Sequence, residues 1–368
     1  MRERRIQEGP EITPGRVPAQ FGASTSMATQ HQRSARTSSP RPRKDLVLGI
    51  DLGATKVVSG LVAPDGTIVR HSGRQVHSND GPGGVIRTVA RSARSCLGDD
   101  YRVPTRVGIA VAAQVDPRTG TVVHAPNLGW RDVPLAQRLR EELNAPVTVI
   151  NDARAAAFAE WKHGAGVGAT DMFLLTLGTG VGGSAVVGGR LLEGGSHACG
   201  EIGHITIVVG GRKCHCPNWG CFEAYVGGWA IAERAQEAVR SDPAGGAYLV
   251  ERAGNAESIT AQTVFQAYRS GDPLSGRLVR ETERFLADGA ISVVNAFNPS
   301  VLVMAGGLVA GMPGFVPIVE SAIRARCQPP AAGTRVVLAA LGEDAALVGA
   351  ACVARTQASR RPRARRPV

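Results

Sequence analysis

The chain has 368 residues, enough for about two domains with their own cores, and a formal net charge of +11 at pH 7. No apolar run approaches the roughly 18 residues that cross a bilayer, which excludes a membrane-spanning protein. The basic N-terminus lacks the apolar core of a signal peptide, and the odd number of cysteines, seven, does not suit a disulfide framework. We therefore expect a cytoplasmic protein with reduced thiols.

The excess positive charge lies at the two ends of the chain. Residues 1–44 contain nine Lys or Arg and three Asp or Glu, and residues 355–368 contain six Arg and no acidic residue. Both ends are rich in Pro, Ser, Arg and Gln and show almost no periodic apolar pattern, which is typical of disorder. We predict disordered basic tails over 1–44 and 357–368. Solvated tails without a specific nucleic-acid partner are favoured, and weak attraction to a polyanion or a membrane surface stays open.

Order is expected to begin with a β-meander. The segment LVLGIDLGATKVVSGLVAPDGTIVRHSG joins apolar runs through a Gly-rich turn and through the turn Pro64-Asp65-Gly66. A unit of the same design returns in MFLLTLGTGVGGSAVVGGRLLEGG, whose Gly-rich turn begins at Gly178. Two such units indicate an internal duplication, and hence two related domains that face each other across a cleft.

The remaining segments alternate strands and helices. Candidate strands are VGIAVAA, VTVI, VLVMA and RVVLAAL, and candidate helices lie near 83–97, 134–143, 223–240, 260–270, 276–296 and 344–356. This mixture predicts the α/β class. We place an N-terminal domain over 45–151, completed by the helix at 344–356, and a C-terminal domain over 152–343.

Two Gly-rich turns are candidates for holding a nucleotide. Asp51-Leu52-Gly53-Ala54-Thr55 and Gly178-Thr179-Gly180-Val181-Gly182-Gly183 each combine backbone N–H groups with a Thr hydroxyl, so they can grip phosphates from two sides. They differ from a P-loop, which requires GxxxxGK[ST], and from a Rossmann loop, which opens a helix. Asp51 supplies a carboxylate for Mg²⁺, usually through water. Alternatively, each turn is only a tight hairpin, although the duplicated context disfavours this.

A strand-to-helix junction between these turns carries a candidate general base. The segment VINDARAAAFAEWKHG predicts a strand that ends at Asn151-Asp152 and a helix that begins there. By position alone, Asp152 is most simply the helix N-cap. A carboxylate at this place is also where a base would accept a proton from a substrate hydroxyl. In HAPNLGWRDVPL, Asn127 is suited to reading hydroxyls, and Trp130 is expected to pack in the core.

The spacing of Cys214, Cys216 and Cys221 predicts a structural zinc site. Three thiols and a histidine are four ligands, the number that a closed tetrahedral site takes, and disulfides would leave one thiol unpaired. His215 lies between two of these cysteines, which hinders its ring from turning to the same ion, whereas His204 can return from a preceding strand. We therefore prefer His204, and we expect the other four cysteines to be core thiols.

These motifs resemble the ROK family (repressor, open reading frame, kinase), and most of all its bacterial zinc-containing glucokinases, over about 45–355. IDLGATK and LGTGVGG resemble its two phosphate motifs, PNLGW its sugar loop, NDARAAA its catalytic motif, GEIGH and CHCPNWGCFE its zinc signature, and MAGGLV its nucleotide-binding Gly pair. The resemblance implies the actin-like ATPase (ribonuclease H-like) fold, with two duplicated domains around a hinged cleft. One departure is Pro217, which stands where the family usually has Gly and forbids a left-handed turn there.

The resemblance also implies roles for individual residues. Asp152 matches the catalytic base, which reverses the preference for capping. The implied sugar-binding positions are Asn127, Asn151, Asp152, Glu201, His204 and Glu223. The implied nucleotide positions are Asp51, Gly53, Ala54, Thr55, Lys56, Gly178, Thr179, Gly180, Gly306 and Gly307, and the implied zinc ligands are His204, Cys214, Cys216 and Cys221. ATP, Mg²⁺ and Zn²⁺ are the implied cofactors.

The implied reaction is ATP-dependent phosphorylation of a hexose, with glucose preferred, in which Asp152 takes the proton. His204 would bind zinc through one ring nitrogen and offer the other towards the sugar. A homodimer or homotetramer is expected. The acceptor could instead be fructose, N-acetylmannosamine or N-acetylglucosamine, and polyphosphate could be the donor. Some members of the family are sugar-responsive transcriptional repressors, but these carry a helix-turn-helix for which residues 1–44 are too short, too polar and too rich in proline.

Overall fold

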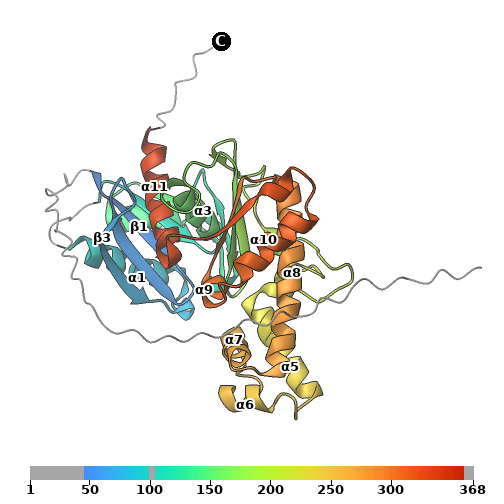
Figure 1. Cartoon of the computed structure of the whole chain (residues 1–368). Coiled ribbons are helices and arrows are strands. Elements are labelled where there is room, and N and C mark those ends of the chain that lie inside the picture. Colours follow the sequence, from blue (N-terminus) through green and yellow to red (C-terminus); the bar gives the residue numbers. More distant parts are fainter. Residues whose placement is uncertain (1–44, 99–103, 360–368) are drawn as a thin grey trace, which may run out of the picture. The chain divides into compact units, whose positions relative to one another are not determined.

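The computed structural model describes residues 45–98 and 104–359, which build two five-stranded sheets with helices packed around them (Figure 1). The predicted tail over 1–44 lies outside these residues, and so does most of the predicted C-terminal tail. The last helix runs to Ser359, two residues beyond the predicted start of that tail at 357. In the part of the chain that the structure describes, no helix is both long enough and apolar enough to cross a lipid bilayer.

The first sheet has the strand order β3-β2-β1-β4-β8. Strands β1 (Val47–Leu52), β2 (Lys56–Val62) and β3 (Ile68–Gln75) are antiparallel neighbours, whereas β4 (Val107–Val111) and β8 (Val147–Asn151) continue the sheet in parallel with β1. Nearly every residue of β1 and β4 is buried, as expected of central strands that are covered on both faces. The first predicted meander is confirmed.

The second sheet repeats this topology in the order β11-β10-β9-β12-β13. Strands β9 (Met172–Leu177), β10 (Val181–Val187) and β11 (Arg190–Leu191) form the antiparallel part, and β12 (Val301–Ala305) and β13 (Arg335–Leu338) run parallel to β9. The second meander is therefore confirmed. The equal order and direction of the strands in both sheets also agree with the predicted internal duplication.

Six of the expected helices are present. They are α1 (Gly81–Leu97), α2 (Leu135–Leu143), α3 (Asp152–His163), α7 (Ala261–Arg269), α8 (Pro273–Phe297) and α11 (Ala345–Ser359). The helix predicted near 223–240 is instead two helices, α4 (Glu223–Val226) and α5 (Gly228–Ser241). They are separate because Gly227 has an extended backbone between them, with φ −66° and ψ 150°.

Several further elements were not predicted from the sequence pattern. They are α6 (Ala247–Ala253), α9 (Gly307–Gly311), α10 (Phe315–Arg326) and a small sheet of β5 (Gln114–Asp116), β6 (Thr121–Ala125) and β7 (Trp130–Val133). The strands of this small sheet are short and interrupted by polar residues, so they lack the continuous apolar runs by which β8 and β12 were predicted. The small sheet presents Asn127 in the connection between β6 and β7. Trp130, predicted to pack in the core, is 1% exposed.

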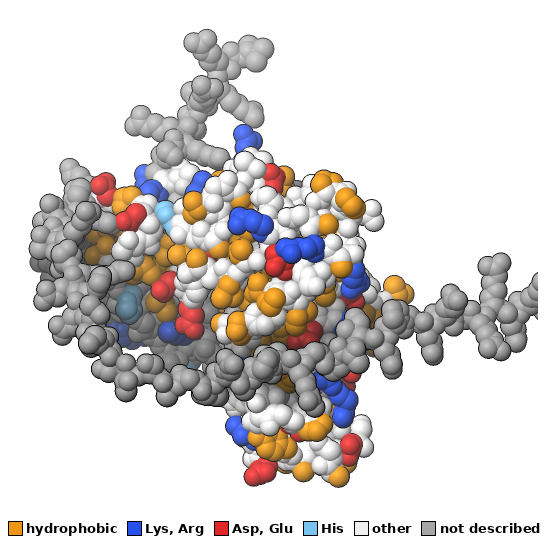
Figure 2. All heavy atoms as spheres, in the orientation of Figure 1, with side chains coloured by type: hydrophobic (Ala, Val, Ile, Leu, Met, Phe, Trp, Pro, Cys, Tyr) orange, Lys and Arg blue, Asp and Glu red, His pale blue; other side chains and the backbone are white. Residues whose placement is uncertain are grey.

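Most of the C-terminal helices share one hydrophobic core with the second sheet. Residues of α5, α7, α8 and α10 cluster with Leu175 of β9 and Met304 of β12. Figure 1 shows α5, α6 and α7 grouped around one end of the long helix α8. The same cluster contains Cys214, Cys221 and Phe222, so the cysteine segment is anchored in this core. On the face shown in Figure 2, basic and acidic side chains are interspersed, in keeping with the 27 basic and 28 acidic residues between 45 and 354.

Helices α3 and α11 pack against each other between the two sheets. Ala351 of α11 clusters with Val47 and Val62 of the first sheet, whereas Ala157 of α3 clusters with Leu174 of the second. Glycines permit this close approach, because a Cβ on Gly349 would collide with the carbonyl oxygen of Ala155, and one on Gly108 with that of Ala350. The two sheets are thereby joined through α3 and α11.

A buried carboxylate on α3 joins this helix to the segment that leads into α11. Glu160 is fully buried and accepts N–H groups from Ala165 (2.7 Å), Ala340 (3.1 Å) and Leu341 (2.8 Å). Three donors satisfy a group that would otherwise be costly to bury. Glu160 therefore connects α3 with residues 340–341, just before the chain returns to the first sheet through α11.

Gly349→Ala is expected to lower the free energy of unfolding by about 1–3 kcal/mol, because the added methyl group would separate α11 from α3. Gly276 in α8 is the matched control, since a Cβ there would meet only the end of the Arg280 side chain, at 3.3 Å. Gly276→Ala should be neutral or stabilise by up to about 1 kcal/mol, as usual for Gly in a helix. Chemical denaturation measures both. Equal effects of the two variants would contradict the close-packing argument.

Candidate active site

The first predicted phosphate turn connects β1 to β2, with Asp51 in the last part of β1. The Gly53 N–H donates to the Lys56 carbonyl (2.9 Å), so it is used within the hairpin and is not free for an anion. Ala54 is half-buried, and the side chains of Thr55 and Lys56 are exposed. The groups left to meet a phosphate are therefore the N–H groups beyond Gly53, the Thr55 hydroxyl and the Lys56 ammonium.

The second turn, between β9 and β10, has the same construction. The Gly178 N–H donates to the Gly180 carbonyl (2.9 Å), while the carbonyls of Gly178 and Thr179 accept N–H groups from the first residues of α5. Thr179 is exposed. Gly306, with φ 94°, lies against the backbone of Leu177, where a Cβ would collide. The structure thus brings the predicted Gly306-Gly307 pair next to the second turn.

Asp51 and Asp152 come together at the carboxyl ends of the parallel strands. The register pairs Asp51 with Ala110 and Val111 with Asn151, so β1, β4 and β8 end side by side. Burial, followed by the negative charge of Asp152, raises the pKa of Asp51 to about 7, and Lys56 opposes the shift. Burial also raises the pKa of Asp152. Two neighbouring carboxylates of this kind fit Mg²⁺, which prefers carboxylate oxygens and would offset their repulsion.

Asp51→Asn is expected to stabilise the metal-free protein at neutral and alkaline pH. Because the pKa of Asp51 rises from 3.8 in the unfolded chain to about 7 in the folded protein, ionisation favours unfolding as the pH increases between these values. Above pH 7 this cost amounts to roughly 2–4 kcal/mol, which the variant avoids. We expect a melting temperature several degrees higher at pH 8 and no gain near pH 4. The exposed Asp344→Asn serves as control, and an equal gain at both pH values would contradict the argument.

The helix α3 is capped by Asn151, not by Asp152. The Asn151 Oδ1 accepts the Arg154 N–H (3.1 Å), as an N-cap does. Asp152 is the first helical residue, and its Oδ1 accepts from the Ala153 N–H (2.8 Å) and from Asn151 Nδ2 (3.0 Å). The interpretation of Asp152 as a cap is therefore wrong. Its carboxylate is oriented by neighbours and remains suited to accept a proton.

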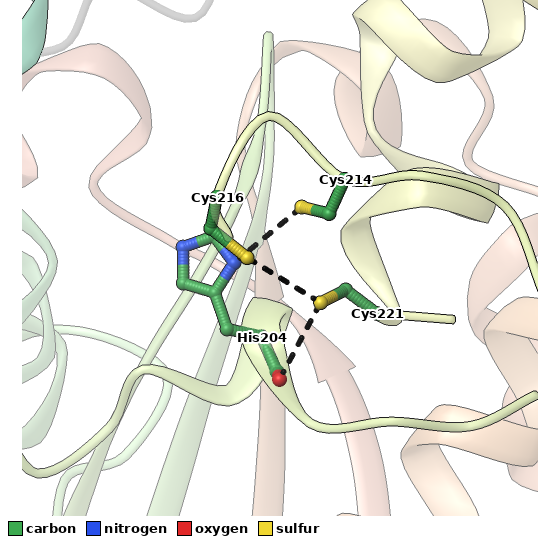
Figure 3. A group of neighbouring side chains, drawn as sticks. All are labelled: His204, Cys214, Cys216 and Cys221. Atoms are coloured by element: carbon green, nitrogen blue, oxygen red, sulfur yellow. Dashed lines mark hydrogen bonds between the residues drawn. The ribbon is translucent and has the colours of Figure 1, made fainter. Parts of the chain in front are cut away.

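The four predicted zinc ligands converge on one point (Figure 3). The ligand atoms of His204, Cys214, Cys216 and Cys221 all lie within 4.8 Å of one another. Cys214 Sγ is 3.8 Å from His204 Nδ1, and Cys216 Sγ is 3.6 Å from Cys221 Sγ. A tetrahedral ion with Zn–S bonds of about 2.3 Å would place two sulfurs about 3.8 Å apart, so the donor set fits zinc.

The protonation of the thiols also bears on metal binding. Burial raises the pKa of Cys221 to about 12 and raises that of Cys214, whereas hydrogen bonds hold the pKa of Cys216 below its ordinary value despite burial. Without a metal, Cys221 is therefore a thiol at neutral pH. Binding of zinc would release protons, because thiolates are the ligands.

The structure separates the two histidines that compete for the fourth ligand position. His215 stacks on Trp229, with ring centroids 3.8 Å apart, and its Nε2 lies 3.4 Å from the Glu233 carboxylate. His204 turns its Nδ1 towards the cysteines, from the 3-10 helix η4 (Ile202–His204) and not from the predicted strand. Pro217 is accommodated, since its carbonyl accepts from Lys213 Nζ (3.2 Å) while the sulfurs still converge.

Glu223 links the zinc segment to the second phosphate turn. Its Oε2 accepts the Val181 N–H (2.8 Å), and its Oε1 accepts from Trp229 Nε1 (3.2 Å). A Cβ on Gly180 would collide with the same carboxylate, so a larger residue there would displace it from Val181 and Trp229. Trp229, which also stacks on His215, has no motif in the sequence and joins the two parts of the site only through the fold.

The remaining predicted residues are less connected. Glu201 immediately precedes η4 and is exposed. Asn127 is exposed in the 3-10 helix η3 (Pro126–Leu128), and in the described part of the chain no hydrogen bond connects it with the other predicted site residues. Arg154 is a further residue that the sequence pattern does not single out, and its contacts with residues 193–199 are described below.

Comparisons with known proteins agree with this arrangement. The sequence model of the ROK family matches residues 47–357. A glucokinase of Streptomyces coelicolor is 33% identical over 317 residues, which cover 84% of this chain and 98% of that protein. An N-acetylmannosamine kinase of Shigella flexneri is 33% identical over 311 residues, 84% of this chain and 98% of that protein.

A solved structure has the same fold. The ROK family glucokinase from Streptomyces griseus in complex with glucose and AMPPNP superposes with a TM-score of 0.73 at 32% identity, covering 84% of this chain and 99% of that one. A ROK hexokinase from Thermus thermophilus superposes with a TM-score of 0.70 at 30% identity, covering 85% and 99% of the two chains. The protein therefore belongs to the ROK family and has its actin-like ATPase fold.

Proposed function

We propose that this protein transfers the γ-phosphoryl group of ATP to the 6-hydroxyl of glucose. Its family and its similarity to sugar kinases support the broader assignment, an ATP-dependent hexose kinase. The observation that carries the proposal is the meeting of Asp51 and Asp152 where parallel strands end. Asp51 can bind the metal ion of the nucleotide, while Asp152 can accept the proton of the acceptor hydroxyl. Phosphoryl transfer needs both roles.

Asp152 is assigned the role of general base. Its Oδ1 already accepts from Ala153 and Asn151, so Oδ2 is the oxygen assigned to the proton of the sugar hydroxyl. The raised pKa of Asp152 makes it a stronger proton acceptor than an exposed aspartate. Asn151, with its Nδ2 shared between Asp152 and the Ala113 carbonyl, holds the orientation of this carboxylate.

The nucleotide is assigned to the space between the two Gly-rich turns. The exposed Thr55 and Thr179 hydroxyls, the Lys56 ammonium and the N–H groups not used inside the hairpins are the donors for its phosphates. Asp51 would hold Mg²⁺, which when bound would neutralise charge on the transferred phosphoryl group.

The sugar is assigned to the region between Asp152 and η4. Glu201, His204 and Glu223 would read its hydroxyls together with Asn127 and Asn151. His204 has its Nδ1 among the cysteine sulfurs, so its Nε2 is the nitrogen available to the sugar. Zinc would hold this ring in place, so that the metal acts on recognition and not on the chemical step.

A second acceptor, N-acetylmannosamine, is favoured by one specific observation. The kinase of that sugar from Shigella flexneri has the same 33% identity to this chain as the glucokinase of Streptomyces coelicolor. Fructose and N-acetylglucosamine are also related hexoses that differ from glucose at one or two positions. Discrimination among them depends on single hydrogen bonds in the sugar site.

A coupled assay of ADP release with Mg-ATP and a panel of these hexoses tests the proposal. We expect the highest kcat/KM with glucose and little ADP release without sugar. Faster turnover with N-acetylmannosamine would make that sugar the preferred acceptor and leave the assignment as a hexose kinase unchanged. No turnover with any hexose, from protein that contains one zinc ion per chain, would overturn the kinase assignment and favour a sugar-responsive regulator.

Three further expectations belong to this proposal. They are a homodimer or homotetramer, which light scattering would measure, a cytoplasmic location, and a domain boundary at 151/152. Asn151 ends β8 and Asp152 begins α3, so this boundary would place the catalytic carboxylate at the junction between domains. Closure of the two domains would then exclude water from the reaction.

A further inference from the structure

One arginine on the helix of the proposed base holds the loop that leads to the sugar-binding residues. Arg154 lies two residues after Asp152, and only 8% of its surface is exposed. Its Nη2 donates to three carbonyl oxygens of this loop, those of Glu193 (3.4 Å), His197 (2.5 Å) and Cys199 (3.0 Å). The loop continues directly into Glu201 and η4, which ends at His204.

The loop has little regular structure of its own. Gly194, His197 and Gly200 have φ values of 76°, 58° and 98°, and such a value is strained for a residue with a side chain, as at His197. At its start, the Leu192 N–H donates to the Ala185 carbonyl (2.9 Å), and at its end Gly200 contacts the backbone of Gly183. Between these anchors, the bonds from Arg154 fix the loop to α3.

On the side of β11, Leu191 packs against the apolar residues of α3, and the loop begins beyond this contact. A cavity of about 570 Å³ lies beside Arg154 and Phe158 of α3, and Gly189, Arg190 and Glu193 form its other wall. Glu193, at the start of the loop, lies at the edge of this cavity. The guanidinium spans this interface next to the cavity.

The same residue also supports the catalytic carboxylate through its backbone. The Arg154 N–H donates to Asn151 Oδ1 (3.1 Å), and Asn151 Nδ2 donates to Asp152 Oδ1 (3.0 Å). Arg154 therefore bonds through its main chain to Asn151, which in turn bonds to the base, and through its side chain to the loop before Glu201.

We propose that Arg154 is a positioning residue that sets the distance between Asp152 and the sugar-binding residues Glu201 and His204. This inference rests on the proposed function. The three carbonyl oxygens all lie around Nη2, whose two N–H groups are fixed in the plane of the guanidinium and so favour one orientation of the loop. Lysine would keep the charge but not this geometry. Burial lowers the pKa of Arg154, and the nearby carboxylates of Glu193 and Glu201 oppose this shift.

The test compares Arg154→Met and Arg154→Lys with Arg190→Met, which removes an exposed arginine from the wall of the same cavity. We expect Arg154→Met to raise the KM for the hexose at least about tenfold and to change the KM for ATP less than about twofold, because a displacement of about 1 Å suffices for such losses. The KM of Arg154→Lys for the hexose should lie between the values for Arg154→Met and the wild type. Arg190→Met should have the wild-type KM. Methylguanidine in the assay should restore part of the affinity of Arg154→Met.

A readout independent of turnover keeps this inference separate from the proposed function. Hydrogen exchange should become faster over residues 193–204 in Arg154→Met and stay unchanged in Arg190→Met. Wild-type exchange and a wild-type KM for the hexose in a folded Arg154→Met would overturn the role of Arg154. If the wild-type protein phosphorylates no hexose and exchange is still faster in Arg154→Met, the loop contact of Arg154 is supported. The proposed function alone would then be wrong.

Discussion

Asp152→Asn is expected to lower kcat by about 10²- to 10⁴-fold, the range that a general base contributes. Asparagine keeps the size of the side chain, and its carbonyl oxygen can still accept the Ala153 N–H that Asp152 Oδ1 accepts at 2.8 Å. It cannot take a proton from the attacking hydroxyl. Hexose affinity and zinc content should therefore stay close to those of the wild type, and steady-state kinetics with calorimetry of sugar binding would show the separation.

Asp344→Asn, at an exposed carboxylate in the 3-10 helix η6 (Gly342–Asp344), is the matched control and should have wild-type kcat. Because a base acts in its deprotonated form, wild-type turnover should fall as the pH decreases. The raised pKa of Asp152 places this fall at higher pH than for an exposed aspartate. Near-normal turnover of Asp152→Asn would exclude Asp152 as the base.

Cys216→Ser is expected to reduce zinc from one ion per chain to nearly none and to abolish measurable hexose binding. Cys216 is half-buried, so the change of sulfur to oxygen costs little packing and reports mainly on the metal. A ligand whose free concentration is a thousand times its Kd stabilises the folded state by about 4 kcal/mol. Loss of zinc should therefore lower the melting temperature by at least about 5 °C. Elemental analysis, calorimetry and thermal melting measure the three effects.

Cys327→Ser is the matched control, because Cys327 is a buried thiol of α10's C-cap that is not part of the zinc group. This variant should keep one zinc ion and wild-type sugar affinity, even where it loses some stability. If Cys216→Ser kept its zinc, the predicted ligand set would be wrong. If it lost zinc and still bound hexose normally, the metal would not position the sugar site.

The two meanders were readable in the sequence because their signals are local. Apolar runs that alternate with Gly-rich turns, as around Gly53 and Gly188-Gly189, force antiparallel pairing between neighbours in the chain. The split at Gly227 and the small sheet of β5 to β7 were not readable. A single extended glycine leaves no pattern, and the short strands of the small sheet are interrupted by polar residues, so they form no apolar run.

The candidate site divides in a similar way. Residue types with a particular spacing, such as the three cysteines with His204, predict a ligand set that the structure brings together. Glu223 was predicted for its chemistry, but its contacts with Val181 and Trp229 depend on how α5 packs behind the second turn. Likewise, an arginine inside an alanine-rich helix gives no sign of its partners, because those lie about 40 residues further along the chain.

The sequence by itself determined the α/β class, the duplicated meanders, the family and the residue types of the site, because these depend on local periodicity and on motif spacing. Only the tertiary structure decided that Asn151 caps α3 and that Asp51 lies beside Asp152. It also decided that the Arg154 side chain donates hydrogen bonds to the loop before Glu201. Such relations arise when strands and helices distant in the chain are packed together, and the energy of each contact depends on burial and geometry that no local pattern encodes.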